Sequence, residues 1–270
     1  MQVEFLVSEH MPELPEVETL CRQLRRTIAG REIIRVEILD HRLGTVDGLV
    51  GRRITAVTRY GKAVVMELDN DSRLLLHLRM TGKMQWQSPS REIPPHTRFI
   101  ISFSHGRLLC IDTRRFATLA ITSDGSAQAF AKDPLHDFRI EEVHKIARMK
   151  KLPVKSFLMD QRWIAGIGNI YACEILHEVS VSPWRPVSGV SLREWRKIEG
   201  ATKEILERAI ACRGTTVSDW RDLFGRKGEY QHELKVYGRE GLPCLRCNGV
   251  IQRLRLSGRG TYFCPTCQRR

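Results

Sequence analysis

The sequence predicts an α+β protein: a helix-capped antiparallel β-sandwich, then a helical domain, then a small C-terminal zinc-finger hairpin. Three observations predict this. Apolar residues recur at helical spacing near the start, and short alternating segments then follow one another without intervening helices. Helical periods return in the second half, before two closely spaced cysteine pairs. At 270 residues, the chain is long enough for two domains of ordinary size.

The first element is a helix that begins near residue 14. Its apolar residues recur at intervals of three and four, at Leu14, Val17, Leu20, Cys21, Leu24 and Ile28. Arginines occupy the other side, and Gly30 provides a C-terminal stop. The pattern predicts one long helix that is buried on one face.

Seven short segments with alternating apolar residues follow this helix. They cover residues 33–39, 54–60, 63–68, 74–78, 99–103, 108–111 and 117–121. Turn signals separate them at residues 69–71 and 105–106. Closely spaced strands without helices between them are typical of an antiparallel sandwich or barrel. We expect the N-terminal helix to cover it.

Helical periods return after about residue 131. We expect helices over residues 140–149, 154–161, 170–179 and 192–211, the last capped by Ser191 with Glu194 three residues on. Asp133-Pro134 breaks any strand, which places a boundary within residues 131–138. The expected organisation is an extension (1–10), an N-terminal β-sandwich domain (11–131), a helical domain (132–228) and a zinc finger (229–270).

The charge balance indicates a polyanionic partner. The chain has 44 Lys and Arg residues against 31 Asp and Glu residues, a formal net charge of +13. Residues 226–270 hold ten basic and three acidic residues, so over half of the net charge lies in one sixth of the chain. We expect this end to contact phosphate, although a basic surface that only aids solubility would give the same count.

The sequence has no 18-residue apolar run, so no transmembrane span is expected. The first ten residues lack the basic flank and the long apolar core of a signal peptide. We therefore expect a cytoplasmic protein, and we expect it to be a monomer. Four single cysteines in apolar surroundings are typical of reduced core thiols, namely Cys21, Cys110, Cys173 and Cys212.

Two prolines and two carboxylates open the N-terminal helix, in the run Met11-Pro12-Glu13-Leu14-Pro15-Glu16. Helix initiation alone could explain Pro12, because proline is tolerated in a first helical turn. If Met11 is the initiator and is removed, however, Pro12 carries a free secondary amine. Such an amine titrates near pH ~8 and can condense with a sugar aldehyde to a cationic iminium, which accepts electrons during elimination.

A glycine-rich turn at residues 165–171 opens one of the predicted helices, with Gly166 and Gly168 in it. Exposed backbone amides and the helix dipole at such a turn suit a phosphate group. Close packing of the two flanking helices is the alternative explanation for the glycines.

The C-terminus holds two Cys-x-x-Cys pairs separated by sixteen residues, at Cys244, Cys247, Cys264 and Cys267. This spacing is typical of a tetrahedral four-thiolate site for one structural Zn²⁺ ion. Disulfides are the alternative, which a reducing compartment disfavours. Residues 254–263 between the pairs predict a hairpin with Arg259 at its glycine-flanked tip, placed for a DNA groove or a phosphate.

The run Met-Pro-Glu-Leu-Pro-Glu-Val-Glu at residues 11–18 resembles the start of the formamidopyrimidine-DNA glycosylase and endonuclease VIII family. Leu14 is similar to the glycosylase branch, since the endonuclease VIII branch usually has glycine there. Residues 161–174 resemble the family's helix-two-turns-helix motif, and the resemblance covers residues 11–268 in all. It implies that the partner is double-stranded DNA containing oxidised bases or abasic sites.

The resemblance also implies which residues contact DNA. Three match residues that bind the DNA backbone in the family: Lys150, Lys155 and Asn169. Three match residues that fill the gap left by a flipped nucleotide: Met80, Arg114 and Phe116. An apolar wedge and an aromatic ring replace lost stacking, and an arginine can bond the orphaned cytosine. Met80 or Phe116 alone could instead be a core residue. His96 resembles a DNA-contacting histidine of the family.

The implied activity is that of a bifunctional DNA glycosylase and abasic-site lyase in base excision repair, acting on oxidised purines such as 8-oxoguanine and formamidopyrimidines. Pro12 would attack the anomeric carbon as the base leaves, and Glu13 would protonate the ribose ring oxygen. Glu16 would support the site. Lys62 would assist the β-elimination, and Arg259 would assist the δ-elimination.

The sequence departs from the family pattern in two places. Ala117 stands where the glycosylase branch commonly has glycine, and residues 1–10 precede the family motif. A retained extension would place Pro12 inside a peptide bond, so we expect translation to start at Met11. Two alternatives stay open: an endonuclease VIII-like enzyme for oxidised pyrimidines, and a non-catalytic zinc-dependent DNA-binding protein in which the extension blocks Pro12.

Overall fold

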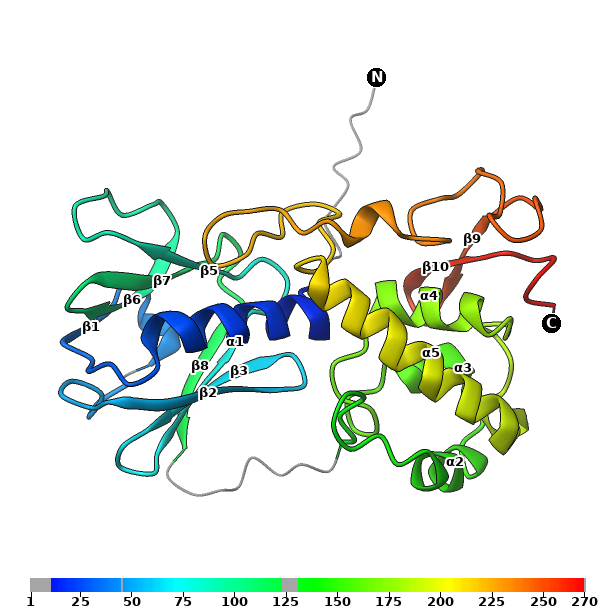
Figure 1. Cartoon of the computed structure of the whole chain (residues 1–270), viewed down its shortest axis with the longest axis horizontal. Helices are drawn as coiled ribbons and strands as arrows, with labels where there is room; N and C mark the ends of the chain where they lie inside the picture. The colour runs from blue at the N-terminus through cyan, green and yellow to red at the C-terminus, as the bar shows by residue number, and fades with distance from the viewer. Residues whose placement is uncertain (1–10, 45, 123–130, 270) are drawn as a thin grey trace. The chain divides into compact units, whose positions relative to one another are not determined.

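The structure is a computed structural model that describes residues 11–44, 46–122 and 131–269. The chain divides into two compact units. Unit 1 contains residues 1–128 together with the later segment 213–229, and unit 2 contains residues 129–212 and 230–270. Figure 1 shows the elements of both. Two stretches that are distant in sequence therefore build each unit.

Unit 1 starts with helix α1 (Leu14–Ile28) and holds two four-stranded antiparallel sheets. One has the strand order β1-β6-β7-β5 and the other β2-β3-β4-β8. The strands are β1 (Arg35–Ile38), β2 (Ile54–Tyr60), β3 (Ala63–Leu68), β4 (Arg73–His77), β5 (Lys83–Gln87), β6 (Thr97–Phe103), β7 (Gly106–Ile111) and β8 (Thr118–Thr122). A short 3₁₀ helix, η1 (His41–Leu43), follows β1.

One hydrophobic core joins α1 to both sheets. The apolar face of α1 is fully buried in it, and Figure 1 shows α1 alongside β2 and β3. The inward residues alternate along the strands, as in β4, where Leu74 and Leu76 are buried while their neighbours are half-buried. This alternation is what a strand with one face on the core requires. The predicted helix-capped antiparallel sandwich is confirmed.

Strand β5 was not predicted from the sequence. It offers only Met84 and Trp86 as apolar residues and lies at the edge of its sheet, so its alternation is short. Its free edge is paired by the returning segment, since the N–H of Trp86 donates to the carbonyl of Leu223 at 2.9 Å. Trp220 and Leu223 also enter the core of unit 1. A segment more than one hundred residues away in sequence thus completes this edge.

Unit 2 is helical, with a C-terminal hairpin. Its helices are α2 (Ile140–Arg148), α3 (Val154–Leu158), α4 (Asn169–Glu178) and α5 (Leu192–Ala211), with 3₁₀ turns η2 (Val187–Gly189) and η3 (Tyr230–His232). The predicted cap of α5 is present, because Ser191 and Glu194 exchange side-chain to backbone hydrogen bonds. No helix among the described residues is long and apolar enough to cross a membrane.

Helix α3 ends three residues before the expected position. Beyond it, the carboxylate of Asp160 accepts a hydrogen bond from the backbone N–H of Arg162 at 3.0 Å, which favours a turn. The predicted hairpin is formed by β9 (Gln252–Leu256) and β10 (Arg259–Phe263), which pair in antiparallel register. Arg259 is exposed and pairs with Leu256 at the end of the ladder, directly after the turn.

Candidate functional site

The start of α1 forms a buried cluster of carboxylates beside Pro12. Pro12 is buried, and Glu13 and Glu16 are each 3% exposed. The backbone N–H of Glu13 donates to Glu16 Oε2 at 2.8 Å, which ties the first turn together as a capping box. Pro15 lies in the first turn of α1, as helix initiation predicts, whereas Pro12 precedes the N-cap residue Glu13 and is outside the helix. The same turn holds two acidic side chains next to Pro12 in the chain.

Glu16 also holds the returning segment of unit 1. Its Oε1 accepts a hydrogen bond of 2.7 Å from the backbone N–H of Thr215. The preceding Gly214 has φ +82°, and a Cβ there would lie 2.7 Å from Glu16 Oε1. Only glycine combines this conformation with the close approach. In this structure, Glu16 therefore supports the start of α1 by bonding it to segment 213–229.

Lys62 and His77 lie near the ends of neighbouring strands. Lys62 is 8% exposed in the turn between β2 and β3, and His77 on β4 pairs with Ala63 on β3. Burial lowers the pKa of His77 to about 4, and the charges of Arg79 and Lys62 add to this. The ring is therefore neutral near pH 7. Its Nδ1 accepts a hydrogen bond of 3.0 Å from the N–H of Arg79.

His77 is a residue that sequence reasoning missed. Arg79 has φ +56°, so the backbone turns sharply just before Met80, and the imidazole of His77 holds that turn. The sequence did contain a signal for this role, because His77 ends a strand three residues before Met80, the proposed apolar wedge. Met80 itself is half-buried.

One buried carboxylate joins the loop after Met80 to the loop that carries Arg114 and Phe116. Asp112 is 1% exposed and accepts a short hydrogen bond from the hydroxyl of Thr81. It also accepts from the backbone N–H of Arg114 at 3.2 Å and of Ala117 at 2.7 Å. The two segments that resemble the family's gap-filling residues are therefore fixed to a common anchor.

A second carboxylate secures the same loop from the other side. Asp40 accepts hydrogen bonds from the guanidinium groups of Arg98 and Arg115, and Arg98 donates to the carbonyl of Ala117 at 2.6 Å. The Arg115 hydrogen bond is the largest cause that holds the pKa of Asp40 well below its usual range. Asp40 and Arg98 are buried and paired, which is what buried charges require.

Between these anchors the loop presents its side chains to solvent. Phe116 is 46% exposed, which excludes a core role for it, and the guanidinium of Arg114 lies 4.7 Å from the centre of its ring. His96 is exposed as well, and its carbonyl accepts from the N–H of Asp112 at 3.0 Å. An exposed aromatic ring with a stacked arginine is suited to a base stack.

In unit 2, Lys155 and Asn169 form a buried cluster with the hairpin. Lys155 Nζ donates to Asn169 Oδ1 at 2.6 Å and to Thr261 Oγ1 at 2.7 Å. Asn169 Nδ2 donates to the carbonyl of Gly260 at 3.0 Å. The structure thus joins α3, the start of α4 and β10. Lys150 is not in this cluster, and its ammonium lies 5.0 Å from the ring centre of Trp163.

The glycine-rich turn before α4 is held by a side chain. Gly166 has φ +93°, and its N–H donates to Gln161 Oε1 at 2.8 Å, so that amide already has an acceptor within the turn. Gly168 is the N-cap of α4. Gln161 Nε2 in turn donates to the carbonyl of Ile167 at 2.8 Å. These bonds fix the turn that presents Asn169 at the first position of the helix.

The four C-terminal cysteines meet as the sequence predicted. Their sulfur atoms all lie within 4.8 Å of one another, with Sγ to Sγ separations of 3.3, 3.5 and 3.9 Å for three of the pairs. A tetrahedral Zn²⁺ site with Zn–S bonds of ~2.3 Å requires sulfur atoms ~3.8 Å apart. The separations exceed a disulfide bond, so Cys244, Cys247, Cys264 and Cys267 fit one zinc ion.

The remaining cysteines do not join this cluster. Cys21, Cys110 and Cys173 are buried and Cys212 is half-buried. Burial raises the pKa of Cys21 and of Cys110 to about 12, which keeps both as neutral thiols. The expectation of reduced core thiols is consistent with this.

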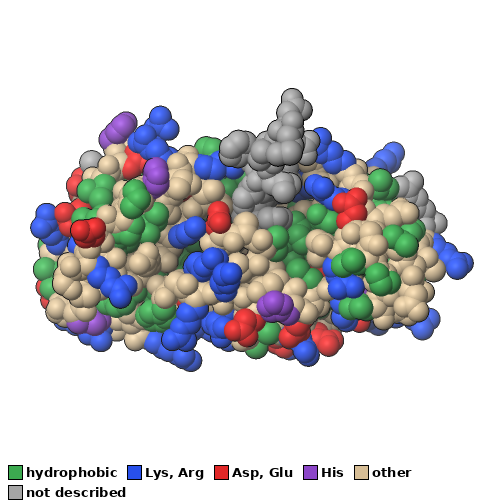
Figure 2. Space-filling model, turned by 90° about the horizontal axis from the view of Figure 1, so that it is seen from above, with side chains coloured by type: hydrophobic (Ala, Val, Ile, Leu, Met, Phe, Trp, Pro, Cys, Tyr) green, Lys and Arg blue, Asp and Glu red, His purple; other side chains and the backbone are tan. Residues whose placement is uncertain are grey.

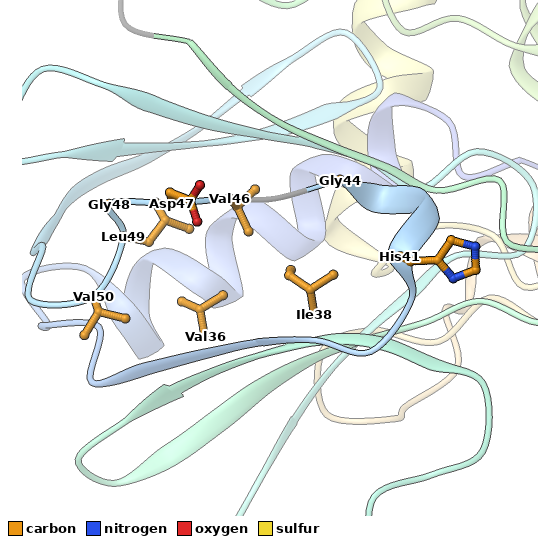
Figure 3. Close-up of a pocket in the computed structure, with 9 residues that line it drawn as sticks. All are labelled: Val36, Ile38, His41, Gly44, Val46, Asp47, Gly48, Leu49 and Val50. Carbon is orange, nitrogen blue, oxygen red and sulfur yellow. The ribbon is translucent and has the colours of Figure 1, made fainter.

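A cavity of about 500 Å³ in unit 1 is a separate feature (Figure 3). Val36 and Ile38 on β1 line one side, and Val46, Leu49 and Val50 on the following loop line the other. None of the predicted site residues lines it.

The surface of the molecule carries many basic side chains. Figure 2 shows Lys and Arg side chains spread over the face that it draws, which is consistent with the net charge of +13.

Comparison with known families covers nearly the whole chain. The formamidopyrimidine-DNA glycosylase N-terminal domain matches residues 11–119 and the H2TH domain of that glycosylase matches residues 130–220. A zinc finger found in FPG and IleRS matches residues 241–270. Each of the three parts that the sequence predicted therefore has a matching family.

Relatives match along their full length. A formamidopyrimidine-DNA glycosylase of Desulfitobacterium hafniense is 37% identical over 274 residues, and one of Heliobacterium modesticaldum is 38% identical over 277; both matches cover 96% of this chain and 100% of the relative. The solved complex of Lactococcus lactis Fpg with abasic-site DNA aligns with a TM-score of 0.89 at 32% identity, over 96% of this chain and 100% of that one.

The fold, the thiolate finger and these matches define a zinc-finger DNA glycosylase, an enzyme of base excision repair. The chain belongs to the formamidopyrimidine-DNA glycosylase family. The resemblance inferred from residues 11–18 is confirmed.

Proposed function

We propose that this protein excises oxidised purines from duplex DNA, including formamidopyrimidines, and then cleaves the abasic site by β,δ-elimination. The observation that supports the purine preference is the exposed Arg114–Phe116 pair, anchored with the Met80 loop on Asp112. Arginine can bond the cytosine that a flipped purine leaves behind. Solved Lactococcus lactis Fpg mutants in complex with Fapy-dG DNA, 31% and 32% identical to this chain, further support it.

We propose that the amine of Pro12 is the nucleophile. It attacks the anomeric carbon of the damaged nucleotide, the bond to the base breaks, and the base leaves with the bonding electron pair. Glu13 protonates the ribose ring oxygen as the ring opens, which leaves an iminium between Pro12 and the sugar. The cationic nitrogen then accepts the electron pair of a C2′–H bond as that proton is lost, and the C3′–O bond breaks to release the first phosphate. Loss of the C4′ proton and cleavage of the C5′–O bond release the second phosphate in the same way.

The remaining residues support these steps. Glu16 holds Glu13 and Thr215 in place, and Lys62 assists the first elimination. Arg259 assists the second, and the product is a gap flanked by phosphates. Glu13 is 3% exposed and is the N-cap residue of α1.

Further residues bind the DNA without taking part in the reaction. Lys150, Lys155 and Asn169 bind the DNA backbone, and His96 contacts DNA. The limits 11–131, 132–228 and 229–270 delimit the three parts, which the matched ranges 11–119, 130–220 and 241–270 support. The enzyme acts as a monomer on chromosomal DNA in the cytoplasm.

Borohydride trapping on an abasic duplex tests the nucleophile. The iminium needs a free amine on Pro12, and residues 1–10 lie outside the described part of the chain. We expect a protein that starts at Pro12 to be trapped covalently, and Pro12→Gly in that form to change the trapping rate while leaving a primary amine. The 270-residue form should not be trapped through Pro12. Equal trapping of both forms would refute Pro12 and point to an amine such as Lys62.

A comparison of substrates tests the lesion preference separately. Excision of 8-oxoguanine opposite cytosine should exceed excision of thymine glycol at equal enzyme concentration. The reverse order would favour the endonuclease VIII-like alternative, without affecting the assignment of the nucleophile.

A further inference from the structure

Helix α4 bonds to the zinc-finger part of unit 2 at three levels along its length. At its start, Asn169 donates to the carbonyl of Gly260 on the hairpin. In its middle, the buried carboxylate of Glu174 accepts from the backbone N–H groups of residues 235–237 at 2.8–3.0 Å. Near its end, His177 Nε2 lies 3.4 Å from the sulfur of Cys244. The last contact touches a zinc ligand directly.

The surroundings of His177 determine which ring nitrogen carries the proton. The residue is 1% exposed, and its Nδ1 is buried without a hydrogen-bond partner among the described residues. A proton on Nδ1 would leave a buried donor unsatisfied, which costs free energy. A proton on Nε2 instead points at the sulfur of Cys244, and Nδ1 then carries only a lone pair.

The sulfur of Cys244 is the right acceptor for this donor when zinc is bound. Four thiolates around one Zn²⁺ carry a net charge of −2, and Cys244 is fully buried, so water cannot solvate its share. The backbone N–H of Arg246 lies 3.4 Å from the same sulfur. An Nε2–H donor adds a second hydrogen bond to this buried ligand.

We infer that His177 positions the zinc site: it donates an Nε2–H hydrogen bond to the Cys244 thiolate and thereby fixes the metal centre to the C-terminal end of α4. The inference is independent of the proposed nucleophile and lesion, because it concerns zinc retention only. It adds a supporting residue outside the four cysteines.

The loop between the first two ligands is held at the same place. The guanidinium of Arg246 donates to the carbonyls of His177 and Glu178 at 2.9 and 3.0 Å and to the hydroxyl of Ser180 at 2.8 Å. A cation at the last carbonyls of a helix is favourable. Since Arg246 keeps this loop docked, removal of the imidazole donor should act on the thiolate and leave the docking in place.

Zinc transfer from the purified full chain to a chelating dye tests the inference. His177→Phe removes the donor and keeps a ring of similar size, and we expect zinc affinity to fall about 10- to 100-fold, as for other outer-sphere partners of metal ligands. His177→Gln restores an N–H donor and should recover most of the affinity. His232→Phe, an exposed histidine in the same unit, is the control and should leave zinc affinity unchanged.

Two spectroscopic measurements separate positioning from general stability. In the cadmium-substituted protein, the ¹¹³Cd resonance should shift in His177→Phe and return towards the wild-type position in His177→Gln. In the wild-type zinc protein, ¹⁵N NMR should show His177 protonated on Nε2. A proton on Nδ1, or wild-type zinc affinity in His177→Phe, would overturn the inference. The ¹⁵N measurement decides the question even if the Phe variant does not fold.

Discussion

The carboxylate of Glu16 on α1 accepts a 2.7 Å hydrogen bond from the backbone N–H of Thr215, 199 residues further along the chain. The same carboxylate caps its own helix through the N–H of Glu13. One side chain therefore fixes both the start of α1 and the segment 213–229 that returns to unit 1. Gln23 reinforces the return, since its amide bonds the carboxylate of Asp222 and the N–H of Leu223.

Glu16→Ala should destabilise the protein. It leaves two buried N–H groups without this acceptor, and a buried donor left unsatisfied costs about 1–3 kcal/mol, so we expect a loss of roughly 2–6 kcal/mol. Urea unfolding measures this, and hydrogen exchange at Thr215 should accelerate. Glu32→Ala, which breaks an exposed 3.9 Å ion pair with Arg53, is the control and should cost less than about 0.5 kcal/mol. Equal effects would contradict the anchoring role.

Arg114→Ala should impair excision from duplex DNA more than cleavage of a preformed abasic site. Without the guanidinium the orphaned cytosine loses its partner, and a good base contact contributes about 1–3 kcal/mol of discrimination. Single-turnover rates on 8-oxoguanine and abasic duplexes give the ratio. Arg35→Ala removes an exposed arginine of unit 1 that pairs with Glu37, and should leave the ratio unchanged. Equal losses on both substrates in Arg114→Ala would count against the assignment.

Asp40→Asn should destabilise the protein near neutral pH by about 3 kcal/mol, because it removes the nearer of the two carboxylates that pair with the buried Arg98 and leaves only Asp112, at 3.6 Å. The pKa of Asp40 is lowered in the folded protein, chiefly by the Arg115 hydrogen bond. The unfolded chain therefore binds this proton first as the pH falls. The stabilising effect is complete above pH ~5 and is lost progressively as the pH falls through and below ~4.

Urea unfolding of wild type and Asp40→Asn between pH 3 and pH 7 checks this dependence. The difference in unfolding free energy should be constant from pH 7 to about pH 5 and should shrink towards pH 3. A difference that does not change over the whole range would show that the charge of Asp40 is not what stabilises the loop.

Cys247→Ser should release the metal. A small hairpin has too little core to fold alone, and metal binding supplies the folding free energy of such modules. We expect zinc content to fall from one per chain to near zero and DNA binding to weaken strongly, while unit 1 stays folded. Elemental analysis and DNA-binding assays measure both effects. Cys212→Ser, outside the cluster, should retain zinc. Wild-type protein purified without zinc would refute the prediction.

The sequence by itself determined the local elements and the zinc ligands. Helix α1 follows from its apolar spacing and α5 from its Ser191 cap, since both depend on residues within a few turns of one another. The four cysteines form two close pairs, one before and one after a single hairpin, so their spacing predicts the cluster. Residues 11–18 were enough to indicate the family.

The tertiary structure alone decided which distant groups meet. Strand β5 pairs with the chain near Leu223, Glu16 bonds Thr215, Asp112 joins two loops through Thr81, and His177 reaches the sulfur of Cys244. A local sequence pattern shows which stretches form helices or strands and where helices begin. It carries no information on which buried donor faces which acceptor, because that depends on how the whole core packs.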